Sequence, residues 1–323
     1  MCTSFIVKTT NSNSFLSRTM DFGFDLSVMP SLCPRKYIWY SDVDSSVYIG
    51  NYSFVGAGKK LDKYLYVDGV NEHGLGCTAL YSQVKSSYST EELENHVNIA
   101  PHELVLWILS TCKDIPMFEE LSPYLNILGA DIGLLDISAP LQWMLADTNG
   151  KCVAVTVEDG YLNIKENPAK ILTETAALDQ HIGKLKKKSR RSSHASSTLN
   201  KFWGFFVELF SKKNIFPIGH HCADRFMKIG HLKQSLPSMM NETDAIQSIR
   251  HLLSHVNISK EAANDDCYTQ YSAIMCLDTM CYYFTPIHSH SVYKLRLKSA
   301  DLGNKRAITS YQVAKTLRIH PLN

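Results

Sequence analysis

The sequence predicts an α+β fold, because strand-like stretches stand at both ends of the chain and helix-like stretches lie between them. β-Branched and aromatic residues open the chain at 3–9 and 14–19 and return at 268–283 and 291–297. A capped amphipathic helix is expected at 243–256, where apolar residues recur on one face. With 323 residues, 45% of them hydrophobic and 20% charged, the chain has ample apolar material for a core.

The first two strands are expected to form a hairpin around the turn residues at 11–13. A two- or four-residue loop sets Asp21 opposite Cys2, and a three-residue loop sets Phe22 there, so the sequence leaves the register open. In each case Arg18 and Asp21 return beside the start of the chain. Three residues apart, they face opposite sides of a regular strand, so both reach one site only if the strand bends.

Cys2 follows the initiator methionine directly, and a cysteine is small enough for that methionine to be removed. The product carries a thiol with an ordinary pKa of about 8.5 and an α-amine of about 7.7–8.0 on one residue, so the amine can accept the thiol proton. A nucleophile activated by its own amine is the chemistry that this pairing allows. Asp21 can hold the protonated amine and Arg18 can favour the thiolate, although a surface ion pair is the alternative interpretation.

The middle of the chain continues the alternation of strands, glycine-rich loops and helices. Strands are expected at 37–40, 47–55, 64–67 and 77–81, with loops at 56–60 and 68–76. A helix is expected to begin at Pro101, which suits the first helical position, and 119–128 is expected to extend the same helical layer unless Pro123 breaks it. A strand pair around the turn at 148–151 follows.

The cysteine content favours a reducing, cytoplasmic compartment. The cysteines are odd in number and form no Cys-x-x-Cys pair, which argues against a disulfide framework and a structural zinc site; they stand at 2, 33, 77, 112, 152, 222, 267, 276 and 281. The His220-His221-Cys222 run is too tightly spaced to converge on one metal ion. No secretion signal is evident, and apolar runs such as 104–109 are too short to span a membrane.

Charge is distributed unevenly. The net charge is +2, but a run of lysines and arginines at 184–191 continues into serine-rich residues that reach about 200. This composition predicts a solvated surface loop. No aromatic residue is interleaved with the run, so binding of nucleic acid is not expected.

Two blocks of the sequence resemble one known family. Cys2-Thr3-Ser4-Phe5, followed by Arg18-Thr19-Met20-Asp21-Phe22, looks like the choloylglycine hydrolases, which comprise conjugated bile acid hydrolases and penicillin V acylases. The turn at 69–76 and the hairpin at 141–150 are similar to family motifs as well. This resemblance implies an N-terminal nucleophile hydrolase fold over 2–323 as one domain, a four-layer αββα sandwich with two antiparallel sheets.

The resemblance also assigns roles to residues downstream. The backbone amide of Tyr81 stands where the family has an oxyanion donor; penicillin V acylases carry Tyr there and bile acid hydrolases Asn. Arg225 matches an arginine that lies beside the N-terminal cysteine, with Asp224 in place of the usual Ser. Glu174 stands where the family has an Asn that donates to the oxyanion, and an ionised carboxylate donates nothing.

The expected activity is therefore hydrolysis of a linear amide in an N-acylated small molecule, with Cys2 as nucleophile and no cofactor or metal. A conjugated bile acid, a phenoxyacetyl β-lactam and an acyl-homoserine lactone are the substrates left open. The resemblance also brings a homo-oligomer, a tetramer or a dimer, into consideration. Two alternatives remain: a relative that binds without turnover because of Glu174, and a thiol protease that uses Cys222 or Cys77 with a histidine.

Overall fold

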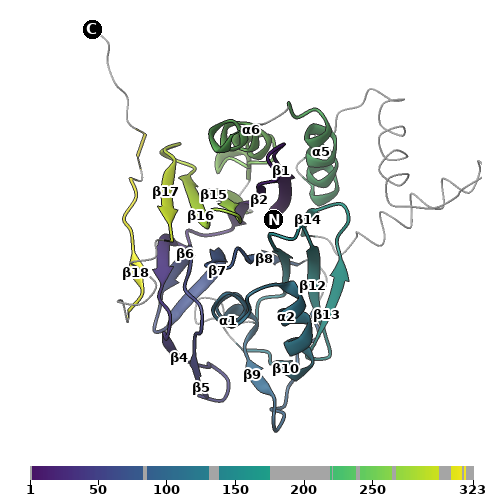
Figure 1. The fold of residues 1–323 in the computed structure, drawn as a ribbon, viewed down its shortest axis with the longest axis vertical. Helices are drawn as coiled ribbons and strands as arrows, with labels where there is room; N and C mark the ends of the chain where they lie inside the picture. Colours follow the sequence, from purple (N-terminus) through teal and green to yellow (C-terminus); the bar gives the residue numbers. More distant parts are fainter. Residues whose placement is uncertain are drawn as a thin grey trace, which may run out of the picture.

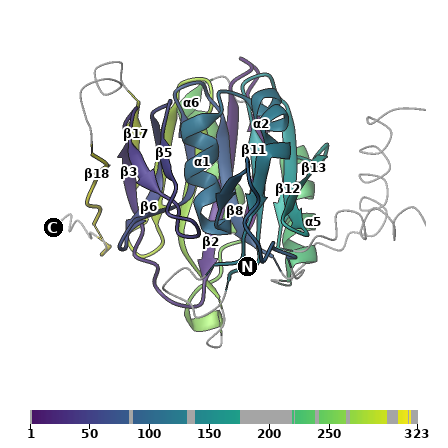
Figure 2. The same ribbon diagram turned by 90° about the horizontal axis from the view of Figure 1, so that it is seen from below.

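The computed structural model describes residues 2–82, 86–130, 138–174, 219, 221–237, 241–263, 267–297, 307–314 and 316–317. Over these residues, two antiparallel sheets lie face to face and helices cover their outer faces, as Figures 1 and 2 show. The predicted αββα sandwich is confirmed. The expected loop at 184–200 lies outside the described residues.

The first sheet joins the two ends of the chain, and it carries the strand that begins behind Cys2. It is six-stranded, and its order is β14-β1-β2-β15-β16-β17. Its strands are β1 (Thr3–Lys8), β2 (Ser14–Phe22), β14 (Ile171–Thr173), β15 (Tyr268–Cys276), β16 (Cys281–Pro286) and β17 (Tyr293–Arg296). Because β1 lies between β14 and β2, the residue ahead of it is surrounded by chain on both sides.

The second sheet is built mainly from the middle of the chain. It is eight-stranded, in the order β13-β12-β11-β8-β7-β6-β3-β18. Its strands are β3 (Met29–Cys33), β6 (Phe54–Lys60), β7 (Tyr64–Asn71), β8 (Gly76–Tyr81), β11 (Leu141–Ala146), β12 (Cys152–Glu158), β13 (Tyr161–Glu166) and β18 (Thr309–Ser310). Two small pairs accompany it: β4 (Ile38–Tyr40) with β5 (Val47–Ile49), and β9 (Val97–Ile99) with β10 (Leu125–Ile127).

Helices close both outer faces. The helical segments are η1 (Pro101–Glu103), α1 (Leu104–Thr111), α2 (Ile115–Leu121), η2 (Ser122–Tyr124), α5 (Cys222–Gln234), α6 (Glu242–Ser254) and η3 (Glu261–Ala263). Figure 1 shows α5 and α6 over the first sheet and α1 and α2 over the second. Separate apolar clusters fill the space between the sheets and beneath each helical layer. No helix within the described ranges is long and apolar enough to cross a membrane.

Three predicted elements differ in the structure. The expected loop at 56–60 belongs to β6, where an added side-chain carbon on Gly56 would lie 2.0 Å from the Asp68 carbonyl oxygen, so glycine permits close strand packing. The expected strand at 47–55 is interrupted, since β5 ends at Ile49 and β6 begins at Phe54. The expected helix at 119–128 ends at Leu121 and continues as η2, which contains Pro123, and then as β10.

Candidate active site

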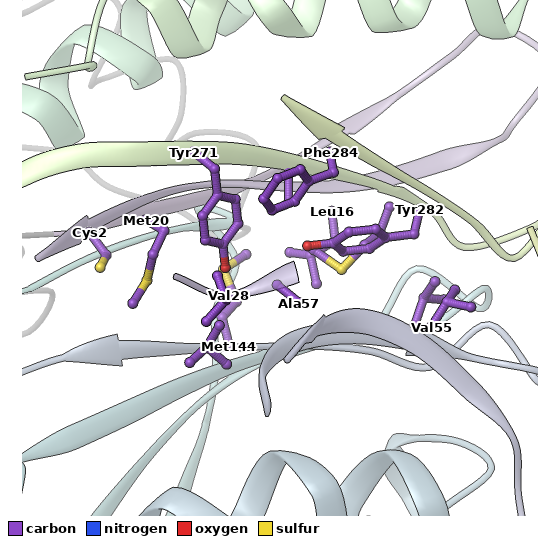
Figure 3. Packing of buried hydrophobic residues seen from close by; sticks show 14 of the residues in the cluster. Cys2, Leu16, Met20, Val28, Val55, Ala57, Met144, Tyr271, Tyr282 and Phe284 are labelled. Carbon is purple, nitrogen blue, oxygen red and sulfur yellow. The ribbon is translucent and has the colours of Figure 1, made fainter. Parts of the chain in front are cut away.

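Cys2 directly precedes β1, and its side chain points into the space between the sheets. Its side chain is 2% exposed and belongs to the apolar cluster between the sheets, where Figure 3 shows it near Met20. Thr3 pairs with Thr19 on one side and with Thr173 on the other, so the registers place Met20 and Glu174 beside Cys2.

The predicted register, with Asp21 or Phe22 opposite Cys2, is wrong. Lys8 pairs with Ser14, which leaves 9–13 as the loop, a longer one than any that was considered. Thr9 closes this loop through hydrogen bonds with Asn13, and Ser12 adopts a positive φ of 69°. The sequence marked a turn here, but its length depends on these local contacts.

The guanidinium of Arg18 contacts the Cys2 sulfur directly. Arg18 Nη2 donates to Cys2 Sγ over 3.2 Å, and the thiol can donate to the main-chain oxygen of Asp21 over 3.5 Å. The other donors of the guanidinium reach the Thr19, Val67 and Ala79 carbonyls, Met20 Sδ and Asp68 Oδ2, at 3.2, 3.1, 2.8, 2.8 and 3.4 Å. Arg18 is 0% exposed, so this cation is fixed next to the sulfur and shielded from water.

Burial alone would lower the pKa of Arg18, but the neighbouring Cys2, Tyr271 and Asp68 raise it above its ordinary value. Arg18 is therefore a permanent cation at this site. A fixed positive charge beside a thiol favours the thiolate, which is the nucleophilic form.

Asp21 lies on the opposite face of β2 from Arg18 and forms a buried ion pair with Arg225. Arg225 Nη2 lies 2.6 Å from Asp21 Oδ2 and also donates to Thr19 Oγ1 over 2.8 Å. Thr269 donates to the other carboxylate oxygen over 2.6 Å. The Thr3 amide donates to the same Thr19 hydroxyl over 3.2 Å, which connects the carboxylate group to the main chain next to Cys2.

Arg18 and Asp21 do face opposite sides of β2, as predicted, and both still flank Cys2. Cys2 directly precedes Thr3, the first paired residue of β1. Its sulfur meets Arg18 on one face of the sheet, and the adjoining Thr3 amide bonds to Thr19 on the face that carries Asp21. The irregularity occurs in the neighbouring strand β15, whose register shifts between Thr269 and Tyr271. Arg225 reaches the site as well, but its contacts above are with Asp21 and Thr19.

Glu174 follows β14 and is 4% exposed. The thiol of Cys222, at the start of α5, donates to Glu174 Oε2 over 3.3 Å. Burial and the Glu174 carboxylate raise the pKa of Cys222 to about 12. Cys222 is thus a protonated donor to Glu174 rather than a second nucleophile, and burial raises the pKa of Cys77 even further.

Tyr81 ends β8 and pairs with Leu141 of β11. Cys2 and Tyr81 line the same narrow pocket, whose cavity volume is about 60 Å³. The rest of its lining is mostly apolar and comes from β2, β7, β8 and β11, from η1 and α1, and from the loops that follow β2 and precede β11: Met20, Phe22, Phe24, Leu26, Leu65, Tyr66, Val67, Ala79, Pro101, His102, Val105, Ala139 and Leu141. An apolar group attached to a carbonyl at Cys2 fits this lining.

A larger cavity of about 490 Å³ lies next to this pocket and shares Leu65 and His102 with it. On its wall the donor atoms of Asp42, His102 and Glu103 lie within 4.8 Å of one another, a cluster that no sequence motif marks. His102 Nε2 lies 2.7 Å from Asp42, and Lys63 forms an ion pair with the same carboxylate. Both oxygens of Glu103 accept hydrogen bonds from the backbone, so protein groups already balance this cluster.

Asp68 is a further buried acid near Arg18 that no sequence pattern marks. Its carboxylate accepts hydrogen bonds from Tyr271 and Tyr282, each over 2.6 Å, and both tyrosines come from the other sheet. No local motif could reveal this group, because Asp68 is more than two hundred residues from either tyrosine and meets them only when the sheets stack.

Comparisons with known proteins identify the family of the chain. A family model described as linear amide C–N hydrolases, choloylglycine hydrolase family, matches residues 2–311. The chain is 25% identical to a bile salt hydrolase/transferase of Clostridium perfringens, over 100% of both chains. It is 23% identical to a conjugated bile acid hydrolase of Lactobacillus gasseri, over 96% of this chain and 100% of that protein.

Solved structures show the same fold. A crystal structure of the conjugated bile acid hydrolase from Clostridium perfringens matches with a TM-score of 0.80 and 24% identity, over 100% of both chains. The penicillin V acylase from Agrobacterium tumefaciens matches with a TM-score of 0.73 and 18% identity, over 95% of this chain and 90% of that one.

Proposed function

The chain belongs to the choloylglycine hydrolase family of linear amide C–N hydrolases, and from this premise we propose that Cys2 is its nucleophile and an N-acylated small molecule its substrate. The observation that carries the proposal is the 3.2 Å contact between Arg18 Nη2 and Cys2 Sγ at the wall of an apolar pocket. Among the cysteines in the described residues, Cys2 has both this contact with an arginine and a position next to the start of the chain.

The proposed reaction begins when removal of Met1 leaves Cys2 with a free α-amine. The amine accepts the thiol proton, and the thiolate that Arg18 stabilises attacks the amide carbonyl. Asp21, held by Arg225, keeps the resulting ammonium in place. The Tyr81 backbone N–H donates to the oxyanion. Arg225 acts through Asp21 in this scheme rather than directly on the sulfur.

The tetrahedral intermediate then collapses. The C–N bond breaks, the ammonium proton passes to the leaving amine, and the acyl group remains on Cys2 as a thioester. Water, deprotonated by the same amine, attacks the thioester and releases the carboxylic acid. Both half-reactions use only groups of Cys2 and its neighbours.

The pocket supports an apolar acyl group, since its lining is mostly aliphatic and aromatic. Relatives of the chain are named for bile salts and for penicillin V, so both substrate types belong in a test panel. Tyr81 matches the acylase pattern and puts penicillin V first. The finer choice among a bile acid conjugate, a phenoxyacetyl β-lactam and an acyl-homoserine lactone stays a prediction.

The test is the intact mass of the purified protein together with product analysis on the panel, with Cys2→Ala as a matched control. We expect the mass of a chain without Met1, and product only when Cys2 is present. A processed protein whose Cys2→Ala variant hydrolyses the same amide at the same rate would contradict the proposal.

A second candidate function, binding without turnover, is favoured by one observation: a buried carboxylate, Glu174, stands beside Cys2 where the family has an amide donor. An anion there repels the developing oxyanion, and a missing donor costs about 10²–10³ in rate. Glu174→Asn is then expected to raise kcat by this factor, with Glu174→Leu as the control that removes the charge without supplying a donor.

These two variants separate the candidate functions. A rate increase in Glu174→Asn alone identifies an impaired oxyanion site. Equal or lower rates in both variants, with an active wild type, would show that Glu174 does not impair catalysis.

We also propose that residues 2–323 form a single domain, because the first sheet pairs β1 and β2 with strands from the end of the chain. The homo-oligomer and the cytoplasmic location stay predictions.

A further inference from the structure

The carboxylate of Asp68 accepts hydrogen bonds from residues of both sheets, and one of these residues, Arg18, also contacts Cys2. Asp68 lies on β7 in the second sheet and is 0% exposed. Its oxygens accept hydrogen bonds from four donors: Tyr282 Oη at 2.6 Å and the Ala57 amide at 3.2 Å on Oδ1, and Tyr271 Oη at 2.6 Å and Arg18 Nη1 at 3.4 Å on Oδ2.

The hydrogen bonds from the two tyrosines to this carboxylate are the shortest of the four, and the contact with Arg18 is the longest. Figure 3 shows Tyr271 and Tyr282 extending from the first sheet into the space between the sheets, with Phe284 beside them. Phe284 stacks on Tyr271 with ring centroids 4.6 Å apart, which fixes that ring. Burial and the Asp68 carboxylate raise the pKa of both tyrosines well above its ordinary value, so both remain protonated donors.

This arrangement leaves the positive charge of Arg18 only partly compensated. A carboxylate that faced Arg18 alone would hold the guanidinium at ordinary ion-pair distance and cancel much of its charge. Here the tyrosine hydroxyls and the Ala57 amide take up part of the negative charge. The other guanidinium nitrogen, Nη2, lies 3.2 Å from Cys2 Sγ.

We propose that Asp68 is a positioning residue for amide hydrolysis, which holds Arg18 against Cys2. Tyr271 and Tyr282 disperse the negative charge of the Asp68 carboxylate, so that the guanidinium of Arg18 still attracts the Cys2 thiolate. The inference rests on the proposed function of Cys2. It assigns a task to three buried polar groups that the reaction scheme above does not use.

The proposal requires shifts of opposite sign from two changes at one carboxylate. In Asp68→Asn the negative charge is removed, so Arg18 attracts the thiolate more strongly and alkylation of Cys2 reaches half its maximal rate at a lower pH. In the double variant Tyr271→Phe/Tyr282→Phe the carboxylate of Asp68 loses both hydroxyl donors and pairs more strongly with Arg18. The guanidinium then attracts the Cys2 thiolate less, so the midpoint of alkylation moves to higher pH. Each shift should be on the order of one pH unit, which is a tenfold change in rate below the midpoint.

The experiment measures iodoacetamide alkylation of the processed full-length protein between pH 5 and 10, by peptide mass spectrometry. A Cys267→Ser background removes the partly exposed cysteine. Tyr283→Phe is the matched control: it lies on the same strand as Tyr282, but its hydroxyl bonds to Glu242 on the opposite face of the sheet. This control should leave both the midpoint and kcat unchanged.

Turnover of the amide is measured on the same proteins. The double tyrosine variant should lose about tenfold in kcat at neutral pH with little change in KM, because the fraction of thiolate falls. Shifts of the same sign in both sets, or no shift in the tyrosine variants, would overturn the inference. The tyrosine variants test the inference by themselves, so the experiment remains decisive if Asp68→Asn does not fold.

The outcome also separates this inference from the proposed function. Suppose that the two sets of variants shift the midpoint in opposite directions while the wild-type protein hydrolyses no amide. This result would contradict the hydrolase role of Cys2 and support the control of its thiolate by Asp68. An active wild type with an unmoved midpoint in the variants would do the reverse.

Discussion

At the residue scale, what distinguishes Cys2 from the other buried cysteines is the group its sulfur contacts. Cys33 is fully buried, and burial raises the pKa of its thiol well above the ordinary value. Burial likewise raises the pKa of Cys152 to about 12. These thiols remain protonated and inert at neutral pH. Cys2 is equally buried, but its sulfur accepts a hydrogen bond from a fixed cation.

The geometry of the cation matters as much as its charge. In Arg18→Lys the point charge of an ammonium cannot reach Cys2 Sγ, the Val67 carbonyl and the Ala79 carbonyl together, so we expect kcat/KM to fall about 10²-fold. Steady-state kinetics on the amide that the wild type hydrolyses fastest measures this. Arg35→Lys is the control, since its guanidinium is 44% exposed and pairs with Glu72 at the surface. Equal losses in both variants would contradict the role given to Arg18.

Part of the site was predictable at this scale, and the reason is local. Cys2 is marked by its position in the chain, and Arg18 and Asp21 return to it whatever the loop length. Their division of labour was not predictable, because it depends on which face of β2 meets the other sheet and which meets α5. Asp68 has no sequence signal at all: a single acid within a strand becomes informative only when Tyr271 and Tyr282 stand opposite it.

At the element scale, polar side chains fix the ends of helices and loops that surround the sheets. Asn241 caps α6 by accepting a hydrogen bond from the Asp244 amide over 2.9 Å. Glu242, the first residue of the helix, bonds to Tyr283 and lies 2.8 Å from Lys294, which ties α6 to the edge of the first sheet. The helix was predicted from its periodicity, but this attachment was not.

Asn241→Ala should lower the free energy of unfolding by about 1 kcal/mol, the usual cost of a lost cap, without a change in activity. Urea denaturation measures the loss. Gln247→Ala, at an exposed position in the middle of the same helix, should alter stability by less than about 0.5 kcal/mol. An unchanged midpoint for Asn241→Ala would show that the attachment through Glu242 holds the helix end by itself.

The loop after β4 is attached to η1 by Asp42, and this attachment depends on pH. Hydrogen bonds from His102 and Lys63 lower the pKa of Asp42 to about 2, although burial opposes them. The stabilisation is therefore complete above the ordinary pKa of 3.8 and is lost as the pH falls towards 2. Between these values the wild type should lose more stability than Asp42→Asn, as measured by urea denaturation at a series of pH values. Parallel curves would contradict this account.

Two of the three elements that were predicted wrongly share a physical cause. Glycines at 56 and 58 suggest a loop in sequence, yet they lie within β6 because close packing on β7 leaves no room for a side chain. Residues 125–127 have no strong local preference and become a strand because β9 supplies a partner. Contacts distant in sequence decided both cases, whereas the strands and helices with clear periodicity were placed correctly.

At the scale of the whole molecule, polar contacts join the two sheets at the end of the sandwich that holds Cys2. Ser4 and Thr78 hydroxyls lie 3.0 Å apart across the gap. Gln142 of the second sheet donates to the Thr173 carbonyl of the first over 2.8 Å. Together with Arg18 and Asp68, these contacts fix how one sheet sits on the other, which apolar packing alone specifies less sharply.

Gln142→Leu should therefore cost about 1–3 kcal/mol of stability, because the Thr173 carbonyl loses its donor inside the protein. Turnover should fall as well, since β14 leads directly to Glu174 beside Cys2. Urea denaturation and kinetics on one preparation measure both effects. Asn163→Leu removes an exposed hydrogen bond to Glu158 and is the control. Full stability in Gln142→Leu would show that the sheets are aligned without this contact.

The position of β1 between β14 and β2 has a consequence for how this chain can be rearranged. Most domains tolerate circular permutation, in which the old ends are joined and new ends are opened elsewhere. Under the mechanism proposed above, the joined product could keep every strand pairing of both sheets and still lack the reaction, because the amine of Cys2 would become a peptide nitrogen with no basic lone pair. In that mechanism the amine at the beginning of the chain is a functional group, and a permuted or N-terminally fused version would be a catalytically silent copy of the same architecture.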